Sequence, residues 1–223
     1  IGLAMAEAFA GAGHHLMLAD LEQGDGAAVA QRLNAAFCAA DLARSRDCSR
    51  LIDATMGQLG RIDILINNAG LQRVSPIEVF TDEDWDRLIA VMLNAPFRLI
   101  RGAWPSMKAR GWGRIINIAS IHALVASPNK AAYVAAKHGL LGLTRTAALE
   151  GGAHGITVNA LCPAYVRTAL VENQIADQAR IHGLPEEDVI ERVMLEPAAV
   201  KRLIEPSEVA ALALYLCSDA AAS

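Results

Sequence analysis

The stretch Ile62-Asp63-Ile64-Leu65-Ile66-Asn67-Asn68-Ala69-Gly70 joins a short apolar run to two asparagines and two small residues. The apolar part, residues 62–66, predicts a buried strand. Ligands of open parallel sheets bind at the carboxyl ends of the strands, and Gly70 would let a ligand approach the backbone closely. Taken alone, residues 67–70 favour a tight turn over a binding site.

Short apolar runs alternate with longer amphipathic stretches over the rest of the chain, which predicts βαβ units. Strands are expected at residues 15–19, 36–40, 62–66, 114–119 and 156–161. Helices are expected at residues 3–12, 26–34, 44–58, 82–110, 130–151 and 207–218. The pattern favours an α/β fold with a doubly wound parallel sheet between two helical layers, formed as a single domain by residues 1–223.

Residues 165–205 interrupt this rhythm with polar, proline-containing helical segments. A long insertion late in an α/β domain is often a lid over the substrate. The pattern fits a plain surface excursion about as well.

The composition argues against several classes of protein. With 223 residues, 53% of them hydrophobic, the chain is long and apolar enough for one well-packed domain. A net charge of −4 gives no sign of the basic patch that nucleic-acid binding needs. The longest apolar runs, such as residues 210–217, are too short to cross a membrane, so a cytoplasmic protein is expected. The cysteines have no paired spacing and indicate neither a metal site nor a disulfide framework: Cys38, Cys48, Cys162 and Cys217.

Acidic residues follow two other predicted strands. Asp20 lies 18 residues after Gly2, where a carboxylate in a dinucleotide-binding unit accepts hydrogen bonds from the adenosine ribose and repels a 2′-phosphate. Asp41 and Leu42 follow the next strand. An acidic residue at a strand end is commonly a solvated turn. These two places and residues 67–70 nevertheless all lie at the sheet edge where ligands bind.

The sharpest constellation is a serine, a tyrosine and a lysine. Tyr133 and Lys137 are four residues apart in one predicted helix and therefore share a face. An ammonium near a phenol favours the phenolate, which would lower the pKa of Tyr133 from about 10 and suit it to proton transfer. Ser120, at the end of the preceding strand, can hydrogen-bond the same substrate oxygen. A Tyr-x-x-x-Lys pair alone is often just a solvated helix face.

Together these motifs resemble those of the short-chain dehydrogenase/reductase family over essentially the whole chain. Residues 67–70 are similar to the family's Asn-Asn-Ala-Gly, and Ile1-Gly2 is similar to the close of its Thr-Gly-x-x-x-Gly-Ile-Gly turn. The resemblance implies a Rossmann-type fold and a dehydrogenase in which Tyr133 exchanges a proton with the substrate, assisted by Ser120 and Lys137. It also implies an NAD site formed by Ile1, Asp20, Asp41, Leu42, Asn68, Ala69, Gly70, Tyr133, Lys137, Pro163, Val166 and Thr168.

Within the family, the chain most resembles bacterial D-3-hydroxybutyrate dehydrogenases. This resemblance rests on Gln72, on residues 120–122, on residues 126–130 and on residues 171–174. It implies that a small hydroxy acid is held by Gln72, His122, Lys130 and Gln174. Taken one at a time these are ordinary polar side chains, and only their joint occurrence favours a binding site.

Lys130 has a separate physical reason to belong to a site. A cation at the start of a helix meets the positive end of the helix dipole, which is unfavourable unless an anion lies nearby. A substrate carboxylate would provide that anion, whereas a well-hydrated surface lysine would need none.

Several residues depart from the family's pattern. Met92 stands where an asparagine of the family helps to hold a water chain to the active-site lysine. Asn94 lies about 200° further around a regular helix and should face elsewhere, unless a bend at Pro96 redirects it. Ala164 stands where the family often has glycine, and Tyr165 where the hydroxybutyrate group tends to have tryptophan, so the pocket should differ modestly in shape.

The ends of the chain depart as well. The family begins with a central strand and ends with a further strand, and the sequence lacks both. A missing central strand leaves unpaired backbone groups in its neighbours, at about 1–3 kcal/mol for each buried group. The chain is therefore expected to be a fragment of a longer gene product.

The leading hypothesis is an NAD-dependent enzyme that interconverts (R)-3-hydroxybutyrate and acetoacetate. The family resemblance implies a homotetramer. It is built from two dimers, and each dimer packs through residues 82–110 and 130–151. One alternative is another reductase of the family, acting on a 3-oxoacyl thioester or a different secondary alcohol. The other is a degenerate nucleotide-binding scaffold without turnover, which Met92 and the missing ends make credible.

Overall fold

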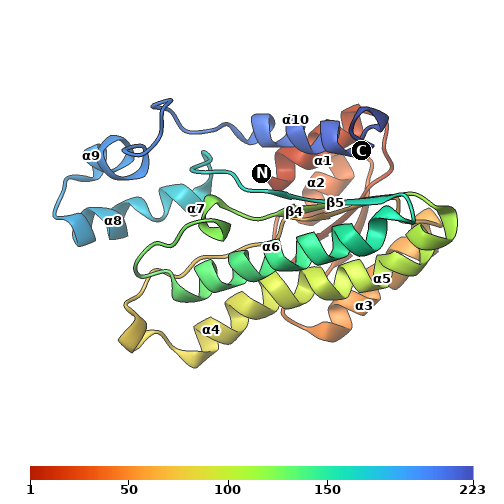
Figure 1. The fold of residues 1–223 in the computed structure, drawn as a ribbon, viewed down its shortest axis with the longest axis horizontal. Coiled ribbons are helices and arrows are strands. Elements are labelled where there is room, and N and C mark those ends of the chain that lie inside the picture. Colours follow the sequence, from red (N-terminus) through yellow and green to blue (C-terminus); the bar gives the residue numbers. More distant parts are fainter. Residues whose placement is uncertain (223) are drawn as a thin grey trace.

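The computed structural model describes residues 1–222, which form parallel strands with helices packed around them (Figure 1). The strands are β1 (Met17–Asp20), β2 (Ala36–Ala39), β3 (Ile64–Asn67), β4 (Gly113–Ile118) and β5 (Ile156–Leu161). The α-helices are α1 (Gly2–Gly11), α2 (Gly26–Arg32), α3 (Ser45–Leu59), α4 (Asp82–Ile89), α5 (Ala95–Arg110), α6 (Ala131–Gly152), α7 (Ala169–Glu172), α8 (Ile175–His182), α9 (Glu186–Val189) and α10 (Pro206–Cys217). The expected strands and helices are confirmed, with ends that shift by no more than two residues.

Short helical turns complete the described chain. Three are 3-10 turns, η1 (Ile77–Val79), η3 (Ile121–Ala123) and η5 (Asp219–Ala221), and two are π-helical, η2 (Ala90–Asn94) and η4 (Ile190–Met194). Among residues 1–222, no helix combines the length and hydrophobicity that crossing a membrane requires.

Hydrogen bonds join the strands into two parallel sheets, β1–β2 and β3–β4–β5. In the larger sheet Ile64 pairs with Arg114, and Gly113 pairs with Ile156. Parallel neighbours need a long crossover, which here is a helix in each case. Within residues 1–222 no strand is hydrogen-bonded to both β1 and β3, and the strands therefore form two separate sheets. The alternation of parallel strands and helices confirms the α/β class.

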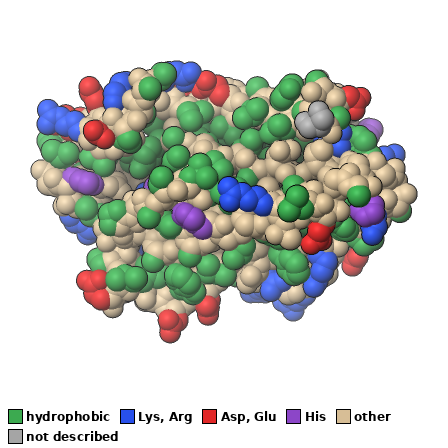
Figure 2. Space-filling view, in the orientation of Figure 1, with side chains coloured by type: hydrophobic (Ala, Val, Ile, Leu, Met, Phe, Trp, Pro, Cys, Tyr) green, Lys and Arg blue, Asp and Glu red, His purple; other side chains and the backbone are tan. Residues whose placement is uncertain are grey.

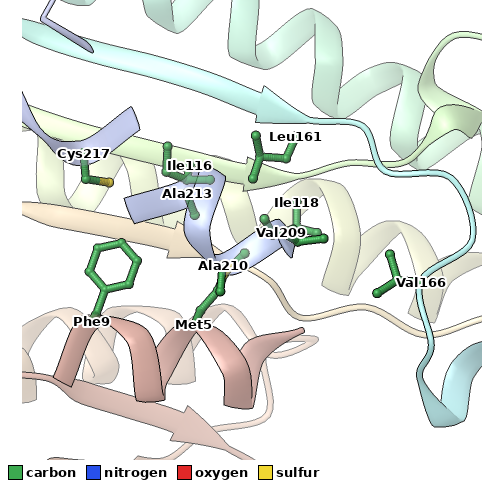
Figure 3. Packing of buried hydrophobic residues seen from close by; sticks show 10 residues of the cluster. All are labelled: Met5, Phe9, Ile116, Ile118, Leu161, Val166, Val209, Ala210, Ala213 and Cys217. Carbon is green, nitrogen blue, oxygen red and sulfur yellow. The ribbon is translucent and has the colours of Figure 1, made fainter. Parts of the chain in front are cut away.

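Helices cover both faces of the larger sheet (Figure 1). On one face, Ile116 of β4 packs in a cluster with Phe9 of α1 and Ala213 of α10 (Figure 3). On the other face, Ile115 packs with Met107 of α5. Neighbouring residues of a strand point to opposite faces, so one strand supplies both cores and the expected three-layer arrangement is confirmed.

The expected helix at residues 82–110 is one helical stretch made of α4, the π-helical turn η2 and α5. The Thr81 hydroxyl caps its start by accepting a hydrogen bond from the Asp84 amide. The irregular turn lies at residues 90–94, before Pro96, rather than at the proline itself. Pro96 follows this turn directly and has no N–H with which to continue the helical hydrogen bonds.

Residues 165–205 extend beyond the ends of β4 and β5 as a lobe containing α7, α8, α9 and η4 (Figure 1). A parallel bridge between Val166 and Ile204 closes the base of this lobe. The lobe has an apolar cluster of its own, to which Val171, Val189 and Met194 belong.

Candidate active site

A cavity of about 230 Å³ lies where the chain leaves β3, β4 and β5. It brings together all the residues predicted for catalysis and for substrate binding, namely Ser120, Tyr133, Lys137, Gln72, His122, Lys130 and Gln174. From the predicted cofactor site it contains Ile1, Asn68, Gly70, Pro163, Val166 and Thr168 as well. The site therefore forms at the carboxyl ends of the strands, as expected for a parallel sheet.

Ser120, Tyr133 and Lys137 come from two neighbouring elements. Tyr133 and Lys137 lie one turn apart on α6, and the Lys137 Nζ atom is 5.6 Å from the centroid of the Tyr133 ring. The Lys137 ammonium donates a 2.7 Å hydrogen bond to the carbonyl oxygen of Ile118, which fixes it against the end of β4. Ser120 follows β4, accepts a hydrogen bond from the His122 amide and is a side-chain partner of Tyr133.

Burial dominates the acid–base properties of this group. It lowers the pKa of Lys137 to about 8, and a nearby cysteine, Cys162, acts weakly in the opposite direction. Burial also raises the pKa of Tyr133, which the hydrogen bond from Ser120 only partly offsets. The expectation that Lys137 lowers the pKa of Tyr133 is therefore wrong for this structure, because desolvation of the phenolate outweighs other effects. Tyr133 keeps its proton at neutral pH and is placed to donate it.

Lys130 is the N-cap residue of α6 and is only 2% exposed. Burial lowers its pKa, and no carboxylate of the described residues counteracts this effect. Its Nζ atom lies 5.9 Å from the centroid of the Tyr165 ring. The surface-lysine interpretation is thus wrong, and a buried ammonium beside the cavity has no anion within the described chain.

The other polar residues of the cavity are incompletely paired. Gln72 Oε1 and His122 Nδ1 are buried and have no hydrogen-bond partner among the described residues. Burial, and then the positive charge of Lys130, lower the pKa of His122 to about 4, so the ring is neutral at physiological pH. Gln174 donates to the Leu170 carbonyl oxygen at 2.6 Å. Unpaired buried polar atoms are costly, and a polar ligand would satisfy them.

The predicted adenosine end fits a dinucleotide. Asp20 is exposed at the end of β1, and its carboxylate accepts hydrogen bonds from the amides of Leu21 and Gly26. A carboxylate has about four acceptor positions, so capacity remains for ribose hydroxyls. A Cβ atom at Gly24 or Gly26 would lie 2.5 Å from the Asp20 side chain, so these glycines leave room for the carboxylate.

Four predicted cofactor residues lie outside the cavity lining: Asp20, Asp41, Leu42 and Ala69. The Asp41 carboxylate accepts a hydrogen bond from the Ala43 amide and pairs with Arg44 at 3.4 Å, so it mainly supports its own turn. Leu42 packs at the edge of an apolar cluster.

Asn94 is exposed and contributes nothing to the cavity, as its position on a regular helix predicts. The irregular turn at residues 90–94 does not direct the Asn94 side chain into the cavity. Met92 is buried in an apolar cluster that Tyr133 borders, and it does not line the cavity.

The cavity also contains Leu170 of the short helix α7, an apolar residue that the sequence did not single out. Four helical residues are too few for periodicity to indicate which side chains turn inward. Among residues 1–222, no group of three or more His, Cys, Asp or Glu side chains is placed to hold a metal ion.

Comparison with known proteins agrees with this geometry. A family model described as enoyl-(acyl carrier protein) reductase matches residues 1–223. A D-beta-hydroxybutyrate dehydrogenase of Rhizobium meliloti (strain 1021) is 55% identical over 183 residues, which are 82% of this chain and 71% of that protein. A protein of the same name from Cupriavidus necator is 40% identical, over 99% of this chain and 88% of that protein.

Two further relatives broaden the comparison. An acetoacetyl-CoA reductase of Rhizobium meliloti is 38% identical, over 80% of this chain and 70% of that protein. The crystal structure of levodione reductase superimposes with a TM-score of 0.89 at 30% identity, over 99% of this chain and 87% of that one. Fold, site and relatives together define an oxidoreductase that uses a nicotinamide dinucleotide. The chain belongs to the short-chain dehydrogenase/reductase family.

Proposed function

We propose that this protein is an NAD-dependent dehydrogenase that interconverts (R)-3-hydroxybutyrate and acetoacetate. The observation that carries the proposal is Lys130, a buried ammonium beside the cavity with no carboxylate partner in the described chain. The carboxylate of a small hydroxy acid supplies the anion that the buried charge and the helix dipole both require. The relatives named D-beta-hydroxybutyrate dehydrogenase support the same substrate.

The residues of the cavity divide the work between binding and proton transfer. A nicotinamide dinucleotide, which residues such as Asn68, Pro163 and Thr168 would hold, would supply reversible hydride transfer at the carbinol carbon of the hydroxy acid. In the reducing direction the Tyr133 Oη atom gives its proton to the substrate oxygen, which Ser120 holds by a hydrogen bond. Lys130 fixes the carboxylate, and neutral His122, Gln72 and Gln174 complete its hydrogen bonds. Residues 165–205 act as the lid that excludes water from this chemistry.

Exchanging Lys130 for methionine tests the substrate assignment, because methionine keeps the apolar stem and removes the charge. Hydrogen bonds to charged groups contribute about 1.5–3 kcal/mol, so kcat/KM for 3-hydroxybutyrate should fall by roughly tenfold to a hundredfold. A neutral secondary alcohol such as 2-butanol should be a poor substrate for the parent enzyme, and its kcat/KM should hardly change in Lys130→Met. The matched control is Lys108→Met, which removes an exposed ammonium at the far end of α5. Equal losses on acid and alcohol would contradict the assignment.

We propose NAD rather than NADP as the cofactor, on the basis of Asp20. Its exposed carboxylate would repel a 2′-phosphate, and Leu21 immediately after it offers no compensating charge. The parent enzyme should therefore show a much higher kcat/KM with NAD, and Asp20→Ala should narrow the difference. Comparable efficiency of the parent with both cofactors would refute the assignment.

A 3-oxoacyl thioester is the second candidate substrate, favoured by the acetoacetyl-CoA reductases among the relatives. Such a thioester has no carboxylate at the position where Lys130 would bind one. A higher kcat/KM with acetoacetyl-CoA than with acetoacetate, unaffected by Lys130→Met, would favour it. Absence of turnover with either compound would favour a scaffold without catalysis.

A further inference from the structure

Tyr165 lies between the cavity and the lobe formed by residues 165–205. Its ring lines the cavity and has the Lys130 Nζ atom 5.9 Å from its centroid. The same side chain packs against the apolar cluster of the lobe, which includes Val171, Val189 and Met194. Its backbone carbonyl also accepts a hydrogen bond from the Ile204 amide at the base of the lobe. Tyr165 is therefore in contact with the ammonium on one side and with the lobe on the other.

The ring suits a buried ammonium that must stay available to a ligand. An aromatic face attracts a cation without neutralising it, whereas a protein carboxylate in this place would pair with Lys130 and compete with the substrate. No such carboxylate acts on Lys130 in the described chain. The Tyr165 ring thus attracts the Lys130 ammonium and leaves its charge available to a ligand.

We propose that Tyr165 determines carboxylate specificity by positioning the Lys130 ammonium toward the cavity, and that its packing on the lobe couples carboxylate binding to seating of the lobe. The proposal rests on the proposed function, since it deepens the account of how the substrate is recognised. It assigns the effect to the aromatic face of Tyr165, and the phenolic hydroxyl is dispensable.

Three substitutions separate these contributions. Tyr165→Phe keeps the ring and removes the hydroxyl, Tyr165→Trp enlarges the aromatic face, and Tyr165→Leu removes the ring but keeps apolar bulk against the lobe. The KM for 3-hydroxybutyrate should change less than twofold in Tyr165→Phe and should remain close to parental in Tyr165→Trp. It should rise about threefold to thirtyfold in Tyr165→Leu, the range expected for a desolvated cation–π contact. The KM for NAD should stay unchanged in all three.

A double-mutant cycle with Lys130→Met tests whether the two side chains act together. In the Lys130→Met background, Tyr165→Leu should not lower kcat/KM for 3-hydroxybutyrate any more than it lowers kcat/KM for 2-butanol. An equal loss on both substrates, or the same loss in the Lys130→Met background, would overturn the proposal and leave Tyr165 as a space-filling wall.

A readout without turnover keeps this test separate from the proposed function. The charge of Lys130 acts on the His122 ring, so displacement of the ammonium changes the His122 titration, which NMR can follow in the cofactor-free protein. Tyr165→Leu should shift this titration and Tyr165→Phe should leave it in place. If the parent does not turn over 3-hydroxybutyrate but this pattern holds, the proposed function fails while the positioning role stands. An unshifted titration in Tyr165→Leu refutes the positioning role whatever the activity.

Discussion

His122 is held neutral first by its burial and then by the positive charge of Lys130, which together lower its pKa to about 4. A neutral imidazole can donate one hydrogen bond and accept another, so the ring can serve a substrate carboxylate without adding a second charge. The buried Nδ1 atom, which has no partner among the described residues, shows where such a bond is available. At the scale of single residues, the cavity carries its positive charge on Lys130 and Lys137 rather than on the histidine.

We expect the His122 ring to titrate near pH 4 in the parent protein. The unfolded value is higher, at about 6.5, so the unfolded chain binds more protons between these values. The contribution of His122 to stability is therefore complete above pH 6.5 and is lost as the pH falls toward 4. Lys130→Met should raise the pKa of His122, because it removes a nearby positive charge. An NMR titration of the ring protons checks both points, and a parental value near 6.5 would contradict them.

The helix α6 carries Lys130, Tyr133 and Lys137 and must keep its register against the larger sheet. A buried chain of hydrogen bonds helps to fix it: Asn67 donates to Asn117, and Asn117 donates to Thr144 of α6 at 2.9 Å. At the far end of the helix, Gly151 lies so close to β5 that an added Cβ atom would be 2.8 Å from the carbonyl oxygen of Ile156. The position of this element thus depends on contacts near its middle and at its C-terminal end.

Gly151→Ala should destabilise the protein by about 1–3 kcal/mol, since a backbone carbonyl cannot move aside as a flexible side chain can. The neighbouring Gly152 is a matched control, because a Cβ atom there meets nothing within 4 Å. Gly152→Ala should be neutral or should stabilise by up to about 1 kcal/mol through the higher helix propensity of alanine. Urea unfolding of the two variants measures the difference. Equal effects would show that α6 does not approach β5 this closely.

At the scale of the whole molecule, apolar side chains remain on the surface of the α5 and α6 layer. Leu149 of α6 is 87% exposed, and Phe97 of α5 is 47% exposed. Figure 2 shows hydrophobic side chains across the middle of the face on which α6 lies, with charged side chains interspersed. Small residues on α6, among them Ala135 and Gly142, would allow a second helix to approach closely. We propose that this layer forms the dimer contact of a homotetramer.

Light scattering at micromolar concentration should therefore give a mass close to four chains. Replacing both Phe97 and Leu149 by glutamate should lower the mass, because paired charges at a contact repel and lose hydration. Val200→Glu, which changes an exposed apolar residue of the lobe, should leave the mass unchanged. A monomer mass for the parent protein would count against the assembly.

Local pattern was sufficient to predict the order of strands and helices, because periodicity depends on neighbouring residues. The spacing of Ser120, Tyr133 and Lys137 also predicted the group that the structure brings together. Element ends shifted by one or two residues, since hydrogen bonding at the termini depends on what packs against them.

Other features depended on residues far apart in the sequence. Pattern alone allowed Lys130 to be a surface lysine, and it predicted a lowered pKa for Tyr133. Both were corrected by burial, which is produced when α6, the segment after β4 and the lobe enclose one cavity. The sequence by itself determined which chemical groups this protein possesses, and the tertiary structure decided their charge states, because the cost of desolvating an ion depends on everything packed around it.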